Sequence, residues 1–143
     1  MDNFKEIFKD LIIEHNLSLR KIFLDTNIAT TRLSSYLNGF LPSIKTAVTL
    51  SNYFNCSVDY LFGLSEQKTT CKLSSTYDMT KFVPRYNKCL EENKISHWKL
   101  CQTSDLNESS LRKWKKGTIP KIDSLIIISK ELSTSIDYLI GRC

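Results

Sequence analysis

The chain has 143 residues, of which 41 % are hydrophobic and 24 % charged, and its formal net charge is +5. This length fits one domain or two small ones. No apolar run approaches the ~18 residues of a membrane span, and the N-terminus lacks a signal peptide's apolar stretch, so we expect a globular, cytoplasmic protein without a membrane partner.

The five cysteines are an odd number, widely spread, and include no CxxC pair. This pattern indicates neither a zinc ribbon nor a thioredoxin-type motif. His97 and Cys101 lie four residues apart and could share a helical face, but a structural zinc site needs four ligands and the sequence offers no others. We therefore expect no metal and no cofactor, and reduced thiols packed mostly as small hydrophobic groups.

The charge is unevenly distributed along the chain. Residues 1–64 carry six Lys/Arg and six Asp/Glu, whereas residues 82–143 carry eleven and seven, a net +4. A mildly basic second half permits a nucleic acid as partner without establishing one.

An internal repeat is the most informative feature of the sequence. Residues 4–63 align without a gap with residues 82–141, and 14 of the 60 aligned positions are identical. Both glycines, the proline and the sequence Asp-Tyr-Leu-x-Gly stay in register, which chance rarely achieves. We predict two domains, at residues 1–64 and 81–143. Between them, residues 65–80 are polar, rich in Ser and Thr, and predict a linker.

The first copy is predicted to form five short helices. An apolar stripe at i, i+3 and i+4 spacing runs from Phe4 to Ile12 and predicts the first. Ser18, Ser43 and Ser57 can cap the second, fourth and fifth, because a serine hydroxyl accepts a bond from an unpaired N–H at a helix start. The third is expected from about Ala29 to Asn38, with Ala29 a poor cap.

The second copy repeats this plan, with helices expected near residues 81–93, 96–103, 107–116, 121–132 and 135–140. In its third helix Asn107 is a good N-cap, Gly117 suits the end, and Leu111 and Trp114 mark the core side. The opposite side then carries hydroxyl and basic groups, namely Ser109, Arg112, Lys113 and Lys116. Such a helix could lie in a DNA major groove; the alternative is a solvated basic face.

Both copies place a capped second helix, a turn of three or four residues and a short third helix in succession, which is the spacing of a helix-turn-helix. The most specific residues are Ser57-Val58-Asp59-Tyr60-Leu61-Phe62-Gly63 and Ser135-Ile136-Asp137-Tyr138-Leu139-Ile140-Gly141; Tyr36-Leu37-Asn38-Gly39 and Trp114-Lys115-Lys116-Gly117 add to them. Both copies resemble the Cro/CI-type (XRE-like) helix-turn-helix domain of phage-type repressors. The resemblance implies an all-α fold of two tandem five-helix, lambda-repressor-like domains.

The resemblance also implies sequence-specific binding of double-stranded DNA and transcriptional control, with localisation to the nucleoid when DNA is bound. Base contacts would come from the start of the second helix and from the third helix. Carried over to this sequence, they are Leu19, Thr30, Thr31, Arg32 and Ser35 in the first copy, and His97, Glu108, Ser109, Ser110 and Lys113 in the second. Phosphate contacts would come from Asn38, Lys99, Lys115 and Lys116, with Arg112 on the same basic side.

The chain departs from the family at several positions. Leu19 and His97 stand where a glutamine is usual, and Phe23 and Cys101 stand where a small residue usually lets the second and third helices meet. We expect Phe23 to spread these helices or reset their angle. Because the first copy is also neutral, we expect the second to bind DNA more strongly and the first to be a weaker DNA reader or a docking partner.

Other functions find less support. No Ser/His/Asp grouping, paired-carboxylate motif or glycine-rich phosphate loop occurs, so we expect no enzyme. Tyr36 and Trp114 are expected in the core rather than stacked on bases, given their spacing from Leu33 and Leu111. The alternative function is a protein-interaction module, antirepressor-like or antitoxin-like, which binds a regulatory protein or a second copy; neutral charge and an exposed Phe40-Leu41 connector favour it.

Overall fold

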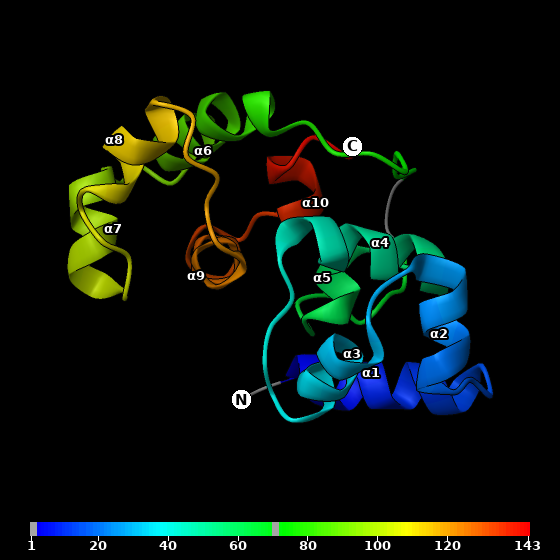
Figure 1. Ribbon diagram of the computed structural model, residues 1–143. Coiled ribbons are helices and arrows are strands. Elements are labelled where there is room, and N and C mark those ends of the chain that lie inside the picture. The colour runs from blue at the N-terminus through cyan, green and yellow to red at the C-terminus, as the bar shows by residue number, and fades with distance from the viewer. Residues whose placement is uncertain (1–2, 70–71) are drawn as a thin grey trace. The chain divides into compact units, whose positions relative to one another are not determined.

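The computed structural model describes residues 3–69 and 72–143, and within these residues it contains helices and no strand (Figure 1). The predicted all-α class is confirmed. The chain divides into two compact units, residues 1–72 and 73–143. In the described part of the chain, no helix is both long enough and apolar enough to cross a membrane.

Within the described residues, the first unit has five helices, and three of them begin directly after the predicted serine caps. Ser18, Ser43 and Ser57 each accept a hydrogen bond from the backbone N–H three residues later, as expected of N-caps. The helices are α1 (Asn3–Glu14), α2 (Leu19–Thr26), α3 (Thr30–Leu37), α4 (Ile44–Phe54) and α5 (Val58–Leu61).

The second unit has five α-helices preceded by one short 3₁₀ turn. Its elements are η1 (Met79–Lys81), α6 (Phe82–Glu92), α7 (His97–Thr103), α8 (Ser110–Lys115), α9 (Ile122–Leu132) and α10 (Ile136–Leu139). The last two α-helices of this unit begin and end 78 positions after those of the first unit, which is the offset of the sequence repeat.

Aromatic rings hold α3 against α1 in the first unit. Phe4 and Phe8, one turn apart on α1, are stacked with ring centroids 5.7 Å apart. Tyr36 from α3 meets both rings edge-on, at 5.8 and 6.1 Å. Since Tyr36 is only 4 % exposed, its expected place in the core is confirmed.

The second unit uses the same arrangement with different rings. Phe82 and Tyr86 on α6 are stacked at 5.8 Å, and Trp114 from α8 meets them edge-on at 5.1 and 5.6 Å. Trp114 is 7 % exposed, so its expected place in the core is also confirmed. Edge-to-face aromatic pairs add about 0.5–1.5 kcal/mol each beyond the area they bury.

Both ends of the segment predicted as a linker, residues 65–80, are hydrogen-bonded to a unit. The Ser57 N–H donates to the Lys68 carbonyl at 2.6 Å, and the Lys68 ammonium pairs with Glu14 at 2.5 Å. On the other side, the Ser74 N–H donates to the Arg142 carbonyl at 2.8 Å. Lys68 and Ser74, both inside the predicted linker, are therefore each bonded to the unit beside them.

Four of the five cysteines lie in the described residues. Cys56, Cys89 and Cys101 are buried, as expected for cysteines packed as small hydrophobic groups, whereas Cys143 is exposed. Cys71 lies outside the described residues.

A buried ion pair fastens the C-terminal end of the second unit. The Arg142 guanidinium lies 2.7 Å from the Asp137 carboxylate, with both side chains 1 % exposed. It also donates through Nε to the Ser74 carbonyl at 2.9 Å. The pair therefore joins the end of the chain to α10 and to the segment that precedes α6.

We predict that Arg142→Met destabilises the second unit by about 3–5 kcal/mol, because the Asp137 carboxylate stays buried without its cation. Both tryptophans lie in this unit, so tryptophan emission during urea unfolding measures its stability. Lys130→Met, at an exposed position on α9, is the control. Equal stabilities for the two variants would contradict the structural role of the pair.

Candidate nucleic-acid interface

The α2–turn–α3 segment of the first unit has the geometry of a helix-turn-helix. Asn27 ends α2 in the left-handed conformation, with φ at 63°, which asparagine tolerates better than most residues. The Thr26 hydroxyl accepts from the Ile28 N–H at 3.2 Å, and Ile28 is 5 % exposed. The turn is thus fixed by one side-chain bond and one buried side chain.

The predicted contact residues on α3 and at its end differ in exposure and in the hydrogen bonds that their side chains form. Thr30 and Thr31 are exposed. The exposed Asn38 donates its amide to the Ser34 carbonyl at 3.3 Å, and the half-buried Ser35 donates to the Arg32 carbonyl at 2.6 Å. Ala29 precedes the helix without a side-chain cap, as the sequence indicates. The first turn of α3 therefore presents two free threonine hydroxyls.

Arg32 is held differently from the expectation. Its Nη2 donates at 2.9 Å to the hydroxyl of Thr46, a 6 %-exposed residue in the first turn of α4. The guanidinium therefore ties α3 to α4, and this bond restricts the positions that its other N–H groups can reach. The sequence could not indicate this, because the two residues are 14 positions apart.

In the second unit, the predicted third helix at residues 107–116 is too long at its start. The helix α8 begins at Ser110, and Glu108 and Ser109 lie in a turn before it. Asn107 acts on this turn instead of on the helix proper, since its side chain accepts from the Ser109 N–H at 2.9 Å and the Ser109 hydroxyl at 2.8 Å. Ser110, the first residue of α8, is half-buried.

His97, a predicted contact residue, is hydrogen-bonded within the second unit. Its Nδ1 lies 2.6 Å from the Tyr86 hydroxyl, and its Nε2 lies 3.1 Å from the Glu108 carbonyl oxygen. The ring also meets Trp114 edge-on at 6.1 Å. Both nitrogens are thus occupied within the unit, and His97 joins α6, α7 and the turn before α8 instead of presenting a free group to DNA.

The partners of His97 determine its protonation pattern. A carbonyl oxygen only accepts, so Nε2 carries the proton and Nδ1 accepts from Tyr86. Burial raises the pKa of Tyr86, which keeps its hydroxyl available as that donor. The neighbouring Cys101 thiol, 3.4 Å from Nε2, has a pKa raised first by burial and then by the Glu108 charge, and so stays neutral.

Basic side chains lie on α8, at its end and on α7. Its basic side chains and the one on α7 are exposed and form no ion pair with any described residue; they are Lys99, Arg112, Lys113, Lys115 and Lys116. The Glu108 carboxylate instead accepts from the Gln102 amide at 2.6 Å. The role of Gln102 could not be predicted from the sequence, because the shape of the turn between Gln102 and Glu108 decides whether their side chains meet.

The corresponding lysine of the first unit is neutralised. Lys21, the counterpart of Lys99, lies 3.2 Å from the Asp25 carboxylate, which also accepts from the Tyr53 hydroxyl at 2.7 Å. The bond from Tyr53, and then that from Lys21, lowers the pKa of Asp25. Burial first, then the bond to Asp25, raises the pKa of Tyr53 to about 12. The units therefore differ in net charge and also at this one position: Lys21 on α2 is paired with a carboxylate, and Lys99 on α7 forms no ion pair with any described residue.

No metal site competes with this interface in the described residues, where no three His, Cys, Asp or Glu side chains gather around a common point.

Comparison with known protein families matches residues 8–61 to the family described as Helix-turn-helix. The match lies inside the first unit and spans α2, the turn and α3, so this stretch of the chain is similar to that family. Domains of this type place their second helix in the major groove of DNA. Neither a curated protein nor a solved structure matches the chain significantly.

We predict that His97→Leu costs the second unit about 1–3 kcal/mol, because the buried Tyr86 hydroxyl loses its acceptor. The double variant Tyr86→Phe/His97→Leu should recover most of this loss, since it copies the Phe8 and Leu19 pair of the first unit. Urea unfolding followed by tryptophan emission measures both. A double variant no more stable than His97→Leu would argue against the bond.

Proposed function

We propose that the chain is a DNA-binding transcriptional regulator of the repressor type, which reads double-stranded DNA with α8 and, more weakly, with α3. The observation that carries the proposal is the set of unpaired cations on α8, a helix anchored by buried Trp114. An anchored helix keeps its exposed side in one orientation, and free lysines near phosphates supply sequence-independent attraction.

We infer that the second unit is a second helix-turn-helix domain, spanning about residues 81–143. The 14 identities of the repeat support this, as do the matched ends of α9 and α10 and the two aromatic clusters. The helix-turn-helix of this unit would consist of α7, the turn at residues 104–109, and α8.

The two domains are expected to contribute unequally. In the first domain Lys21 is paired with Asp25 and the Arg32 guanidinium bonds to Thr46. Thr30 and Thr31 remain as base-contact candidates, and Asn38 as a phosphate contact. In the second domain, the candidates are Glu108, Ser109, Ser110 and Lys113 for bases, and Lys99, Arg112, Lys115 and Lys116 for phosphates. Since these sets differ at nearly every position, the preferred DNA site should be asymmetric.

We predict that Lys113→Ala and Lys116→Ala each weaken binding to a duplex selected from a random pool. Fluorescence anisotropy over a salt series measures the loss. If Lys116 contacts a phosphate, its removal should reduce the slope of log K against log salt by about 0.9. Removal of Lys113, a base-contact candidate, should instead relax sequence preference at one base pair, at a cost of about 1–3 kcal/mol.

The matched control is Lys130→Ala, which removes an exposed charge from α9 of the same unit. It lowers the net charge by the same amount but should change affinity much less. Equal losses for Lys116→Ala and Lys130→Ala would mean that general charge, and not α8, attracts the DNA. No loss in any of the three variants would defeat the assignment.

A second candidate function is a protein-interaction module, favoured by the connector that follows α3. Phe40 is 68 % and Leu41 41 % exposed, and adjacent exposed apolar side chains often mark a protein interface. The partner would be a second copy or a regulatory protein. This function and DNA binding are compatible, because the connector lies after the helix that would enter the groove.

If the connector mediates self-association, the double variant Phe40→Ser/Leu41→Ser should be monomeric at concentrations where the natural chain is not. Light scattering measures the molar mass. Ile13→Ser, which removes a 66 %-exposed apolar side chain from α1, is the control. The same molar mass for the natural chain, the double variant and Ile13→Ser would show that this connector does not mediate self-association.

A further inference from the structure

Glu108, in the turn before α8, is held by α7 at two points. The His97 Nε2 donates to the Glu108 carbonyl oxygen at 3.1 Å, and the Gln102 amide donates to its carboxylate oxygen Oε1 at 2.6 Å. Because a carboxylate only accepts hydrogen bonds, the Gln102 amide must present its NH2 group to it. Both the backbone and the side chain of Glu108 are therefore positioned by the helix that precedes it.

Capping of α8 does not account for the Glu108 carboxylate. The first N–H groups of this helix are served by Asn107, whose side chain accepts from the Ser109 N–H at 2.9 Å and whose carbonyl accepts from the Ser110 N–H at 3.0 Å. No described backbone N–H donates to the Glu108 side chain. The carboxylate is therefore available for a partner outside the chain.

Glu108 is also unpaired with the basic side chains of α7 and α8. Arg112 lies four residues further on and Lys99 lies on α7, but neither forms an ion pair with it. The second carboxylate oxygen, Oε2, accepts from no described group. Since Glu108 is exposed, this oxygen can accept from a donor on a binding partner.

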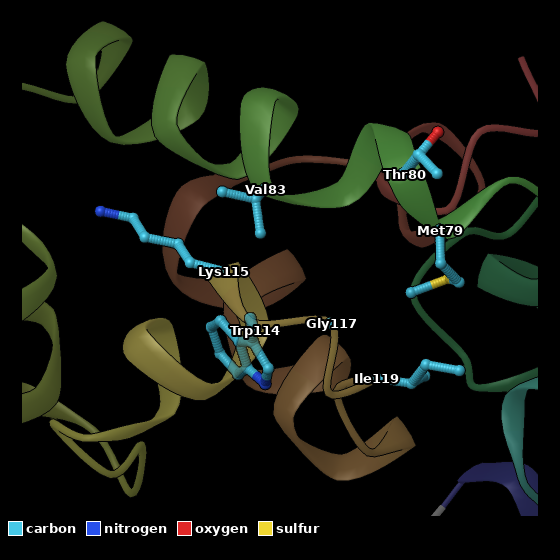
Figure 2. A pocket seen from close by; sticks show the side chains of 7 residues that line it. All are labelled: Met79, Thr80, Val83, Trp114, Lys115, Gly117 and Ile119. Carbon is cyan, nitrogen blue, oxygen red and sulfur yellow. The ribbon is translucent and has the colours of Figure 1, made fainter.

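The turn that carries Glu108 leads into a helix with a fixed orientation. Trp114 of α8 is 7 % exposed, and its ring meets Phe82 and Tyr86 edge-on. Figure 2 shows the Trp114 ring and the Lys115 ammonium directed to different sides, so the core contact sets which side of α8 faces solvent. Because Glu108 lies two residues before α8 begins, a duplex that accepts this helix also comes close to the Glu108 carboxylate.

We propose that Glu108 reads the amino group of one cytosine in the major groove and that Gln102 is its positioning residue. This inference rests on the proposed function. Negative phosphates repel a carboxylate, so in contact with DNA it is favoured only at a donor on a base edge. In the major groove, guanine and thymine present acceptors, and the adenine amino group lies beside the N7 acceptor. Cytosine presents its N4 amino group without an acceptor beside it on the same base, and is therefore the base that suits a carboxylate.

Gln102 should sharpen this preference by restricting the Glu108 side chain. Without the amide, the carboxylate could turn towards Arg112 and form an exposed ion pair, which would take it away from the base edge. The first unit offers a comparison, because the aligned positions hold Leu24 and Thr30, whose side chains cannot form this bond. Cytosine reading of this kind is therefore expected from the second unit alone.

Selection of duplexes from a random pool by the full chain is the first test. The variants Glu108→Thr and Gln102→Leu copy the residues of the first unit at the aligned positions. Glu131→Gln, which removes an exposed carboxylate from α9, is the control. The parent and Glu131→Gln should select cytosine at one position where Glu108→Thr shows no preference. Identical base preferences of the parent and Glu108→Thr at every position would overturn the proposal.

Glu108→Gln tests the acceptor through a gain instead of a loss. Glutamine has nearly the same shape, and its amide matches adenine, which offers an acceptor and a donor side by side. Preference at the same position should therefore move from cytosine towards adenine, a result that misfolding cannot produce. A preference for cytosine over adenine as strong as that of the parent would overturn the role of the carboxylate.

A duplex with N4-methylcytosine at that position tests the contact itself. The methyl group replaces the N4–H that faces the groove and leaves the pairing with guanine. In fluorescence anisotropy, the affinity of the parent should fall about fivefold or more, whereas that of Glu108→Thr should change much less. Equal losses for the parent and Glu108→Thr would overturn the contact.

The positioning role of Gln102 is tested on natural duplexes that differ only at this base pair. Gln102→Leu should lower the preference for cytosine by about two- to fivefold, since one hydrogen bond no longer restricts the carboxylate. The midpoint of urea unfolding should stay unchanged, because both side chains of the bond are exposed. A merely structural role would instead shift this midpoint and weaken binding to every sequence equally. An unchanged preference for cytosine would overturn the positioning role.

The outcomes separate this inference from the function on which it rests. A parent chain that binds no duplex would defeat the proposed function and, with it, the cytosine contact. DNA binding whose base preference is the same in Glu108→Thr would overturn the cytosine contact and leave the proposed function standing.

Discussion

The edge-on contact between one ring of the third helix and two stacked rings of the first is the interaction on which each unit depends. Tyr36 meets Phe4 and Phe8, and Trp114 meets Phe82 and Tyr86, at centroid distances between 5.1 and 6.1 Å. Helices as short as α3 and α8 are marginal by themselves in water. The aromatic anchor supplies the burial that lets each persist and sets which side it turns to solvent.

Both units pack the third helix against the first with aromatic rings, but the polar atoms next to this contact differ between them. In the first, the corresponding positions hold Phe8 and Leu19, whose side chains carry no polar atom. In the second, the corresponding Tyr86 and His97 bring polar atoms into the core edge, where the His97 ring bonds to the Tyr86 hydroxyl and the Glu108 carbonyl. In the second unit, His97 therefore links α6, α7 and the turn before α8. The basic side chains of α7 and α8 form no ion pair with any described residue, whereas Lys21 of the first unit is paired with Asp25.

Much of the fold could be predicted because it follows from local patterns. Serine caps, apolar spacing and the repeat predict the helix order, and the spacing of Trp114 from Leu111 predicts its burial. The predicted start of this helix at residue 107 is wrong, since α8 begins three residues later. The reason is that Asn107 can cap a turn as well as a helix. The bonds of Arg32 to Thr46 and of His97 to Tyr86 could not be predicted, because the partners come from other helices. Periodicity in a single sequence indicates which face of a helix is buried. It does not indicate which long side chains of different helices contact each other.

The most direct test of the account is a titration of the isotope-labelled full chain with a selected duplex, followed by amide chemical shifts. If α8 lies in the major groove, the largest changes should fall between Glu108 and Lys116, with smaller ones at the start of α7 and around Thr30 and Thr31. Amides of α9, such as that of Lys130, should change little. Binding accompanied by changes centred on α9 or α10, with α8 unaffected, would contradict the central claim.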